Sequence, residues 1–324
     1  MCTAITFSAK DHYFGRNLDL DRSLNEQVII TPRKFTFRFE NDSESIDHAA
    51  IIGMGIVADG YPLYYDATSE DGLSAAALNF PKQAVYHNRK DGFHNIAPFE
   101  FIPWLLCRCK TVNDAKQLLK TTNLIQDNFS KRFPASPLHW LIADRENAIT
   151  VESVAGGLEV YDNPIGVLTN SPYFDYHLLN LENYLNLTSM EPINRFSQQL
   201  ELKPYSFGMG AIGLPGDLSS ASRFVRATFT KFNSQCDHNE SSAVSQFFHI
   251  LGSVAQTNGC NKIGKYYERT IYSSCCNIDQ GIYYYTTYDN RQISAVCLRN
   301  ENLDLNKLVI YPLLNSEQIL WVNK

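Results

Sequence analysis

Residues 1–21, MCTAITFSAKDHYFGRNLDLD, contain two short apolar runs, CTAITFSA and YFGRNLD, which are joined by the polar residues KDH. Runs of this length and composition are typical of β-strands. The link is too short for the crossover helix that parallel strands need, so we expect an antiparallel hairpin. The second strand of this hairpin then brings Arg16 and Asp19 back alongside Cys2.

The rest of the chain repeats this pattern. Further strand-like runs follow, several of them separated by only a few polar residues: QVIITPR, AIIGMGI, LSAAALNF, HWLIADR, AITVESV, YERTIYSSC, GIYYYTTYD, QISAVCL and KLVIYPL. Helical periodicity occurs in two regions, 97–121 and 173–255, with Ser or Asn as cap candidates before most of the helices. We therefore expect an α+β fold of mainly antiparallel sheets covered by helices. No linker-like or repeated segment divides the chain, which predicts a single domain over residues 1–324.

Composition narrows the class of protein. The 324 residues are 44% hydrophobic and carry a formal net charge of -6. That charge offers no positive field for a phosphate backbone, so we expect no nucleic acid partner. No run approaches the roughly 18 apolar residues of a membrane span, and no signal segment opens the chain, which predicts no membrane insertion. The eight cysteines are then expected to be reduced thiols in the cytoplasm.

Two motifs that suggest other functions lack support from their context. Residues 208–213, GMGAIG, fit the dinucleotide pattern G-x-G-x-x-G, but the following LPG prolongs the loop where a helix should begin. The cysteine pairs do not have the spacing of a zinc site, and we expect buried small side chains at Cys107, Cys109, Cys275 and Cys276. A thiol redox protein would need pairs that these spacings do not provide.

The eight histidines are scattered along the chain. His139 and His249 lie within apolar runs, where a histidine is more typical of a satisfied core residue than of a general base. A Cys/His protease dyad has no local support in the sequence.

Cys2 has chemistry available to no other residue. Cysteine is small enough for Met1 to be removed, which leaves Cys2 with a free α-amine. An α-amine with a pKa of about 7.7 to 8 can accept the proton of a thiol with a pKa of about 8.5, so nucleophile and base share one residue. The Arg16 guanidinium would favour the thiolate, and the Asp19 carboxylate could hold the amine. If Met1 stays in place, the nitrogen is an amide and this mechanism fails.

Blocks of sequence along the whole chain, in a fixed order, point to a known family. They are MCTAITF, YFGRNLDLD, YPLYYDATSEDGLSAAALNFP, PFEFIPWLL, PLHWLIAD, PIGVLTNSP, GLPGDLSSASRF, QFFHIL and GIYYYTTYDN. In these blocks the chain resembles the choloylglycine hydrolases, N-terminal nucleophile amidases that include bile salt hydrolases and penicillin V acylases. The resemblance implies a four-layer αββα sandwich, with two mainly antiparallel sheets between helical layers. The pattern of strands and helices permits this fold without establishing it.

The resemblance also implies a catalytic site. It places the catalytic residues at Cys2, Arg16, Asp19, Asn79, Asn170 and Arg223. The backbone N–H of Asn79 and the side-chain amide of Asn170 would stabilise the oxyanion. Taken singly, each asparagine is equally typical of a turn, and Arg223 of a salt bridge. The implied reaction passes through a thioester at Cys2 and requires no metal or organic cofactor.

The implied substrates are conjugated bile salts, which would release glycine or taurine. Family positions of the acyl pocket fall on Leu18, Ala58, Tyr65, Phe129 and Phe133, although each of the aromatics could equally be a core residue. Asn79 is typical of the bile salt branch, whereas the penicillin branch carries tyrosine there. The alternatives are a penicillin V or other N-acyl amide hydrolase, and a non-catalytic sterol or acyl-ligand binding protein. The resemblance further implies a homotetramer.

Overall fold

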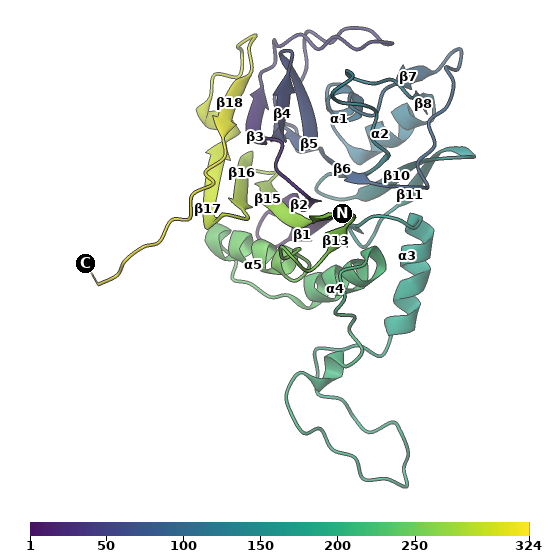
Figure 1. The fold of residues 1–324 in the computed structure, drawn as a ribbon, viewed down its shortest axis with the longest axis vertical. Helices are drawn as coiled ribbons and strands as arrows, with labels where there is room; N and C mark the ends of the chain where they lie inside the picture. Colours follow the sequence, from purple (N-terminus) through teal and green to yellow (C-terminus); the bar gives the residue numbers. More distant parts are fainter. Residues whose placement is uncertain (324) are drawn as a thin grey trace.

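The predicted N-terminal hairpin lies at the centre of the computed structural model, which describes residues 1–323 (Figure 1). Strand β1 (Cys2–Ser8) pairs antiparallel with β2 (His12–Leu20). Cys2 lies opposite Leu18 in this pairing. The hairpin therefore brings the end of β2 alongside the first residues of the chain, as the short link predicts.

The hairpin belongs to a six-stranded antiparallel sheet with the strand order β12, β1, β2, β15, β16, β17. The additional strands are β12 (Val167–Leu168), β15 (Arg269–Asn277), β16 (Ile282–Thr287) and β17 (Asn290–Cys297). Strands β2 and β15 approach so closely that a Cβ on Gly15 would lie 2.0 Å from the carbonyl oxygen of Ser274. This contact explains why the run YFGRNLD contains a glycine.

A second, eight-stranded sheet has the order β11, β10, β9, β6, β5, β4, β3, β18, and its pairs are antiparallel. Its strands are β3 (Gln27–Thr31), β4 (Ile51–Ala58), β5 (Tyr61–Ser69), β6 (Ser74–Asn79), β9 (Leu138–Ala143), β10 (Ala148–Val154), β11 (Gly157–Asp162) and β18 (Val309–Pro312). The central strands are buried on both faces, which is why their sequences are continuous apolar runs.

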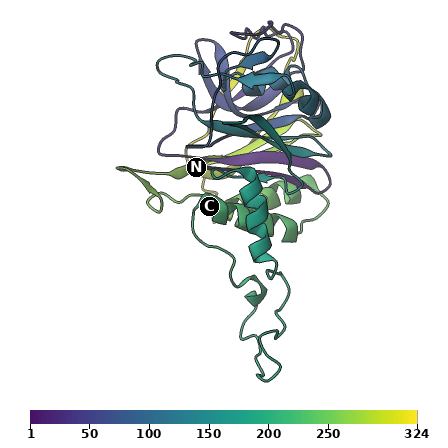
Figure 2. The ribbon, with the colours of Figure 1, turned by 90° about the vertical axis from the view of Figure 1, so that its right-hand side faces the viewer.

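Helices cover the outer sides of the two facing sheets (Figures 1 and 2). On the first sheet lie α4 (Ser220–Asn233) and α5 (Glu240–Gly252), with α3 (Phe174–Leu181) beside α4. On the second sheet lie α1 (Phe101–Leu106) and α2 (Val112–Leu119). One apolar core fills the space between the sheets and under α4 and α5, and another lies under α1 and α2. This αββα arrangement confirms the predicted fold class.

The predicted Ser or Asn cap is confirmed for α4 and α5, whereas α2 is capped by a threonine and neither α1 nor α3 has a side-chain cap. The side chains of Ser219 and Asn239 accept hydrogen bonds from the first turns of α4 and α5, and Thr111 forms a reciprocal capping box with Asp114 in α2. None of the helices within residues 1–323 combines the length and the apolar composition that crossing a membrane requires.

Short elements complete the fold. Strands β7 (His94–Ile96) and β8 (Thr122–Leu124) form a parallel pair, and β13 (Lys262–Ile263) pairs with β14 (Tyr266–Tyr267). Single 3₁₀ turns occur at Glu182–Tyr184, Met209–Ala211 and Leu298–Asn300. The turn at Met209–Ala211 lies within GMGAIG, which neither follows a strand nor opens an α-helix. This motif is therefore not a dinucleotide-binding loop.

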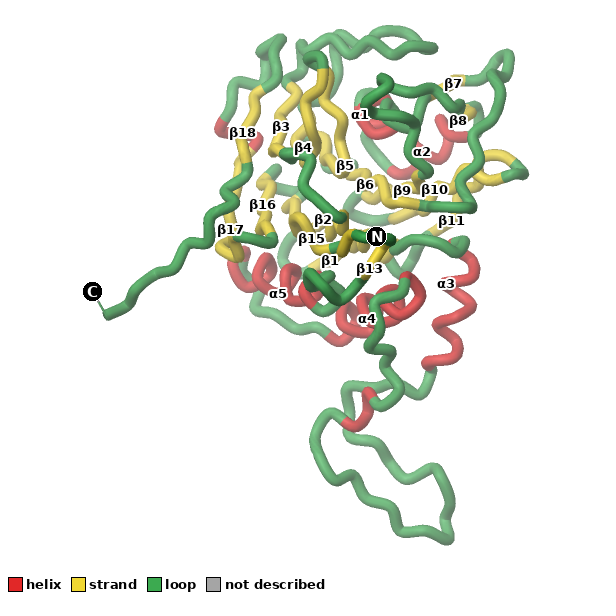
Figure 3. Tube along the Cα trace, in the orientation of Figure 1, coloured by secondary structure: helices red, strands yellow, loops and turns green. Residues whose placement is uncertain are grey.

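The segment of residues 185–219, here called the arm, extends away from the helical layer (Figures 1 and 2). Apart from its one 3₁₀ turn it is irregular, as the colouring by secondary structure shows (Figure 3). Its exposed apolar side chains include Leu185, Met190, Ile193, Phe196, Leu202, Tyr205, Phe207 and Ile212. Neither the length nor the exposure of the arm was anticipated, because it interrupts the helical region predicted at 173–255.

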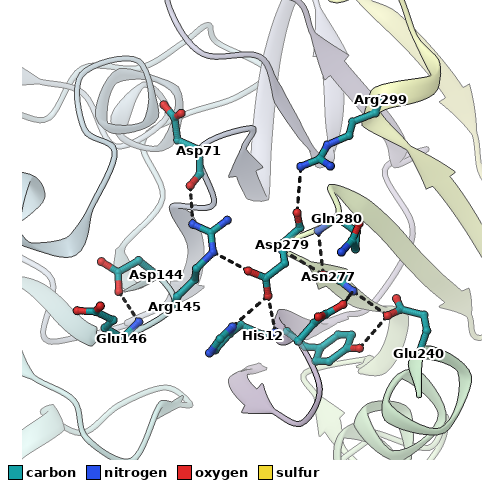
Figure 4. Close-up of polar contacts among 12 residues, drawn as sticks. His12, Asp71, Asp144, Arg145, Glu146, Glu240, Asn277, Asp279, Gln280 and Arg299 are labelled. Carbon is teal, nitrogen blue, oxygen red and sulfur yellow. Dashed lines mark hydrogen bonds and ion pairs between the residues drawn. The ribbon is translucent and has the colours of Figure 1, made fainter. Parts of the chain in front are cut away.

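A polar cluster joins turns of both sheets at the turn of the N-terminal hairpin (Figure 4). Asp279, between β15 and β16, accepts hydrogen bonds from the backbone N–H of His12 (2.7 Å) and from Nε of Arg145 (2.5 Å). Arg145, between β9 and β10, also donates to the backbone carbonyl of Asp71, 3.0 Å away. Burial opposes the charged form of Asp279, but these donors lower its pKa. The cluster thereby links the two sheets.

The two histidines that lie within apolar runs differ in burial. His139 is fully buried, with Nδ1 3.1 Å from Oε1 of Glu152 and Nε2 3.0 Å from the carbonyl oxygen of Thr169, which confirms a satisfied core histidine. His249 is exposed, so that prediction was wrong. It lies on the solvent-facing side of α5, where the periodicity of an amphipathic helix interrupts the apolar run.

The eight cysteines are free thiols. Cys109, Cys275 and Cys276 are buried and Cys107 is half-buried. The predicted burial is therefore confirmed for Cys109, Cys275 and Cys276 but only in part for Cys107.

Candidate active site

Cys2 opens β1 and lies beside a cavity of about 680 Å³. Its side chain is 2% exposed. Arg16, which follows on β2, lines the same cavity. The hairpin thus places the thiol and a guanidinium together at a hollow in the core.

Arg16 is completely buried. Its Nη1 donates to the backbone carbonyls of Tyr65 (3.0 Å) and Ala77, while Nη2 has no hydrogen-bond partner among residues 1–323. Burial disfavours the guanidinium, but the interactions with Cys2, Tyr272 and other neighbours raise the pKa of Arg16 above its ordinary value. A guanidinium that stays charged therefore lies beside the thiol.

Asp66 is a buried carboxylate whose charge interacts with that of Arg16, and sequence analysis missed it. Its carboxylate accepts hydrogen bonds from the hydroxyls of Tyr272 (2.6 Å), Tyr283 (2.6 Å) and Ser274 (3.2 Å). Burial raises the pKa of Asp66, and the charge of Arg16 opposes this effect. The available signal was a single Asp inside YYDAT, an otherwise uncharged strand.

Asp19 is buried near the end of β2 and next to the start of the chain. Its Oδ1 accepts a 2.7 Å hydrogen bond from the hydroxyl of Thr270, and its Oδ2 has no partner among residues 1–323. Burial raises the pKa of Asp19, while Arg223 and the α-ammonium group lower it. The Met1 ammonium donates to the backbone carbonyl of Asp19 rather than to its carboxylate. Within residues 1–323, Oδ2 of Asp19 therefore remains without a hydrogen-bond donor.

The side chain of Asn170 connects the other predicted residues. Its Oδ1 accepts hydrogen bonds from the backbone N–H of Cys2 (2.8 Å) and from Nη2 of Arg223 (2.7 Å). Its Nδ2 donates to the backbone carbonyl of Asn79, 2.7 Å away at the end of β6. The structure thus brings Asn79, Asn170 and Arg223 together beside Cys2.

The backbone of Asn170 is held from both sides. Its N–H donates to Oγ of Ser220 (2.8 Å), and its carbonyl oxygen lies 2.9 Å from Nε2 of His177. His177 is buried and stacks on Phe224, with ring centroids 4.8 Å apart. Burial lowers the pKa of His177 to about 4, so this ring is a neutral donor at pH 7. Sequence analysis missed His177, which no motif distinguishes.

Arg223 is the second completely buried arginine of the site. From the first turn of α4, its Nη1 donates to the carbonyl oxygen of Cys2 and to the hydroxyl of Thr3 (2.7 Å), and its Nε donates to the carbonyl of Leu218 (3.0 Å). Burial lowers its pKa, while the charge of Asp19 raises it. A cation is unfavourable at a helix N-terminus. Its bonds to the Cys2 segment explain its presence there.

The cavity beside Cys2 is lined by aliphatic and aromatic side chains. Four of the five predicted pocket residues, Leu18, Tyr65, Phe129 and Phe133, line it, but Ala58 does not. Ala58 is the last residue of β4, at the turn to β5.

Further lining residues were not predicted. Ile56 of β4 and Leu63 of β5 contribute to the wall, together with Phe99. The exposed Arg22 and Arg132 also belong to the lining. Such a cavity suits a broad apolar group that ends in a polar part.

Taken together, these groups can perform nucleophilic acyl chemistry. A buried thiol has two buried guanidinium groups and an oriented asparagine amide around it, and an apolar cavity beside it. Within residues 1–323, no cluster of three or more His, Cys, Asp or Glu side chains is placed to hold a metal ion.

A cysteine that opens the first strand of an αββα sandwich, beside these polar groups, defines an amide hydrolase of the N-terminal nucleophile class. The family model described as "Linear amide C-N hydrolases, choloylglycine hydrolase family" matches residues 2–311, and the chain belongs to this family. The bile salt hydrolase/transferase of Lactiplantibacillus plantarum is 53% identical over 324 residues, with both chains covered completely. That of Clostridium perfringens is 38% identical over 330 residues, again with full coverage of both chains.

Solved structures of other proteins superpose on this chain over most of its length. The C2A mutant of the conjugated bile acid hydrolase from Clostridium perfringens superposes with a TM-score of 0.92 at 36% identity, covering 100% of both chains. The penicillin V acylase from Agrobacterium tumefaciens gives a TM-score of 0.75 at 16% identity, covering 95% of this chain and 90% of the other. The second likeness shows a common fold.

Proposed function

We propose that this protein hydrolyses the amide bond of glycine- or taurine-conjugated bile salts. The observation that carries this proposal is the position of Cys2, whose nitrogen is oriented by Asn170 and whose thiol lies beside an apolar cavity. The relatives that are 53% and 38% identical over their whole length are named bile salt hydrolases, which supports the substrate class.

The first half of the proposed reaction forms a thioester. Removal of Met1 exposes the α-amine of Cys2, which accepts the thiol proton. The thiolate, stabilised by Arg16, attacks the amide carbonyl, and the α-ammonium then protonates the departing nitrogen. Glycine or taurine leaves, and the acyl group stays on sulfur. In the second half, water that is deprotonated by the same amine hydrolyses the thioester. The proposed steps use only groups of the chain, the substrate and water, without a metal or organic cofactor.

The surrounding residues receive distinct proposed roles. The Nδ2 of Asn170 and the backbone N–H of Asn79 stabilise the oxyanion, a role supported by the 2.7 Å bond that places the two residues side by side. Arg223 holds both the Cys2 carbonyl and the Asn170 side chain. The Asp19 carboxylate, whose Oδ2 has no partner in the part of the chain that the structure describes, holds the α-amine.

Substrate preference can be measured directly. We expect the purified protein, with Met1 absent by intact mass, to release glycine or taurine from glycocholate or taurocholate faster than it cleaves penicillin V. Leu18, Tyr65, Phe129 and Phe133 would contact the steroid. A preference for penicillin V would place the protein among the acylases. Binding of bile salts without any product would favour the sterol-binding alternative.

A second activity, transfer of the acyl group to an amine, is favoured by the name hydrolase/transferase of the 53% identical relative. A thioester reacts with an amine as it does with water. The test is formation of a new amide when the enzyme turns over a conjugate in the presence of a different amino acid.

We propose a homo-oligomer, in line with the tetramer implied by the resemblance. The arm supports this proposal, because its projecting apolar side chains are unfavourable in water and a second copy of the chain would cover them.

The core that continues from β1 through the second sheet to η3 (Leu298–Asn300) supports the proposal of one domain over residues 1–324. The free thiols support a cytoplasmic location.

A further inference from the structure

Glu268 is a buried carboxylate next to Cys2 that the mechanism above does not use. It immediately precedes β15 and is 7% exposed. Its Oε1 accepts a 2.6 Å hydrogen bond from the α-ammonium of Met1, and its Oε2 accepts one of 2.8 Å from Nδ2 of Asn261. The same Met1 nitrogen donates to the backbone carbonyl of Asp19, 2.9 Å away. Two acceptors therefore converge on the position of the Met1 nitrogen.

This position is adjacent to the atom that acts as the base. The nitrogens of Met1 and Cys2 belong to consecutive residues, so backbone dimensions keep them at most about 3.7 Å apart. When Met1 is removed, the Cys2 nitrogen becomes the α-amine, and Glu268 and the Asp19 carbonyl lose the donor that they share. A water molecule at this position would have the carboxylate, the carbonyl and the amine as neighbours. Buried waters typically make about three such hydrogen bonds.

Arg223 does not replace the lost donor. Its charge acts on Glu268 at a distance, but its nitrogens already donate to Cys2, Thr3 and Asn170. After the removal of Met1, one carboxylate oxygen of Glu268 therefore lacks its donor and faces the α-amine of Cys2.

We propose that Glu268 is a positioning residue for the second half of the reaction: with the Asp19 carbonyl, it holds the water that hydrolyses the Cys2 thioester. This inference rests on the proposed function. The water oxygen bonds to the thioester carbonyl carbon while the α-amine takes one water proton. The carbon–sulfur bond then breaks, the acid leaves, and the α-ammonium returns the proton to the thiolate. Atoms and charge balance without another reactant.

The variant Glu268→Ala separates this role from acylation. Acylation precedes the water step, so we expect kcat and KM to fall together by about tenfold or more, with kcat/KM nearly unchanged. Intact mass under turnover should detect the acyl thioester on Cys2 in the variant. Hydroxylamine, which attacks without needing a bound water, should restore turnover. A purely structural role would produce none of this pattern.

Two further variants control for charge and folding. Glu268→Gln keeps an acceptor oxygen and should remain close to the wild type. Glu268→Asp keeps the charge but withdraws the carboxylate by one methylene, so it should show the same kinetic pattern more weakly, even if the Ala variant does not fold.

Three results would overturn the inference and leave the proposed function standing. The first is an unchanged kcat, with no thioester detected, in all three variants. The second is a fall in kcat/KM at constant KM. The third is retention of Met1 in the Glu268 variants, which would indicate a role in the removal of Met1. A wild-type protein without Met1 that hydrolyses no amide would overturn both proposals.

Discussion

The backbone nitrogen of Cys2 donates a 2.8 Å hydrogen bond to Oδ1 of Asn170. This nitrogen is the base of the proposed reaction once Met1 is removed. The same oxygen also accepts a hydrogen bond from Arg223, so rotation of the Asn170 side-chain amide would break both bonds. In the observed orientation, Nδ2 is directed at the Asn79 carbonyl. Asn170 thereby orients the base through its oxygen and offers a donor to the oxyanion through its nitrogen.

Replacing the nucleophile should abolish the reaction without unfolding the protein. In Cys2→Ala the α-amine and its bond to Asn170 are kept and only the sulfur is lost, so amino acid release should fall below detection. The free energy of unfolding should change by only about 1 kcal/mol, since little buried volume is removed. Product assays and denaturant titration test both parts. Turnover equal to that of the wild type would refute Cys2 as nucleophile.

Asn170→Asp tests the oxyanion role. The aspartate still offers an acceptor to Cys2 and Arg223, but an anionic oxygen replaces the Nδ2 donor and faces the Asn79 carbonyl. Loss of one such donor typically lowers kcat by about 10²- to 10³-fold. The exposed Asn183→Asp is the matched control and should keep wild-type kcat. If both variants were equally active, Asn170 would have no part in stabilising the oxyanion.

The parts of the fold that local patterns specify were predicted correctly. The KDH link forces the hairpin, and continuous apolar runs such as LSAAALNF become strands buried on both faces. The caps of α4 and α5 follow from Ser219 and Asn239. Alternation and link length do not specify which strands of different sheets face each other. The pattern therefore predicts antiparallel sheets covered by helices, and only the family resemblance implies the four-layer αββα stacking.

The residues that were missed act over long distances in sequence. Glu268 contacts Met1 across 267 positions, and Tyr272 reaches Asp66 across 206. No spacing rule connects such residues, because the contact exists only after the sheets are stacked. The error at His249 has a different origin: a short apolar run does not show which side of a helix faces the core.

Substitutions in the arm should dissociate the oligomer without destabilising the subunit. Phe196 and Phe207 are 82% and 102% exposed, so serine at both positions removes apolar surface and leaves the core unchanged. We expect the wild type to be an oligomer and Phe196→Ser/Phe207→Ser to have a lower mass by light scattering. Ile46→Ser, at an exposed position outside the arm, is the control. Identical masses for the wild type and the double variant would exclude the arm as the interface.

His177 should make the protein less stable in mild acid. Its pKa is lowered by burial from 6.5 to about 4, so between these pH values the unfolded chain binds a proton that the folded chain does not. This contribution to stability is complete above about pH 6.5 and is lost as the pH falls towards 4, by roughly 3 kcal/mol in total.

The variant His177→Gln can still donate to the Asn170 carbonyl but does not titrate. Between pH 6.5 and 5, the free energy of unfolding of the wild type should fall by about 2 kcal/mol more than that of the variant, as measured by urea denaturation. Parallel pH profiles would show that His177 titrates normally in the folded protein.

Glu100 should have the opposite effect in the same pH range. It is buried at the start of α1 and accepts hydrogen bonds from the backbone N–H groups of Glu40 (2.8 Å) and Ala97 (3.4 Å), and burial raises its pKa from 4.5 to about 7. As the pH rises through this window, the unfolded chain releases its proton first, so the folded state loses roughly 3 kcal/mol of stability.

The variant Glu100→Gln keeps the hydrogen bond from Glu40 and carries no charge. Its free energy of unfolding relative to the wild type should therefore increase by about 3 kcal/mol between pH 4.5 and 8, and a constant difference would show that Glu100 ionises normally in the folded protein. Because the wild-type profile combines this effect with that of His177, only the differences between each variant and the wild type separate them.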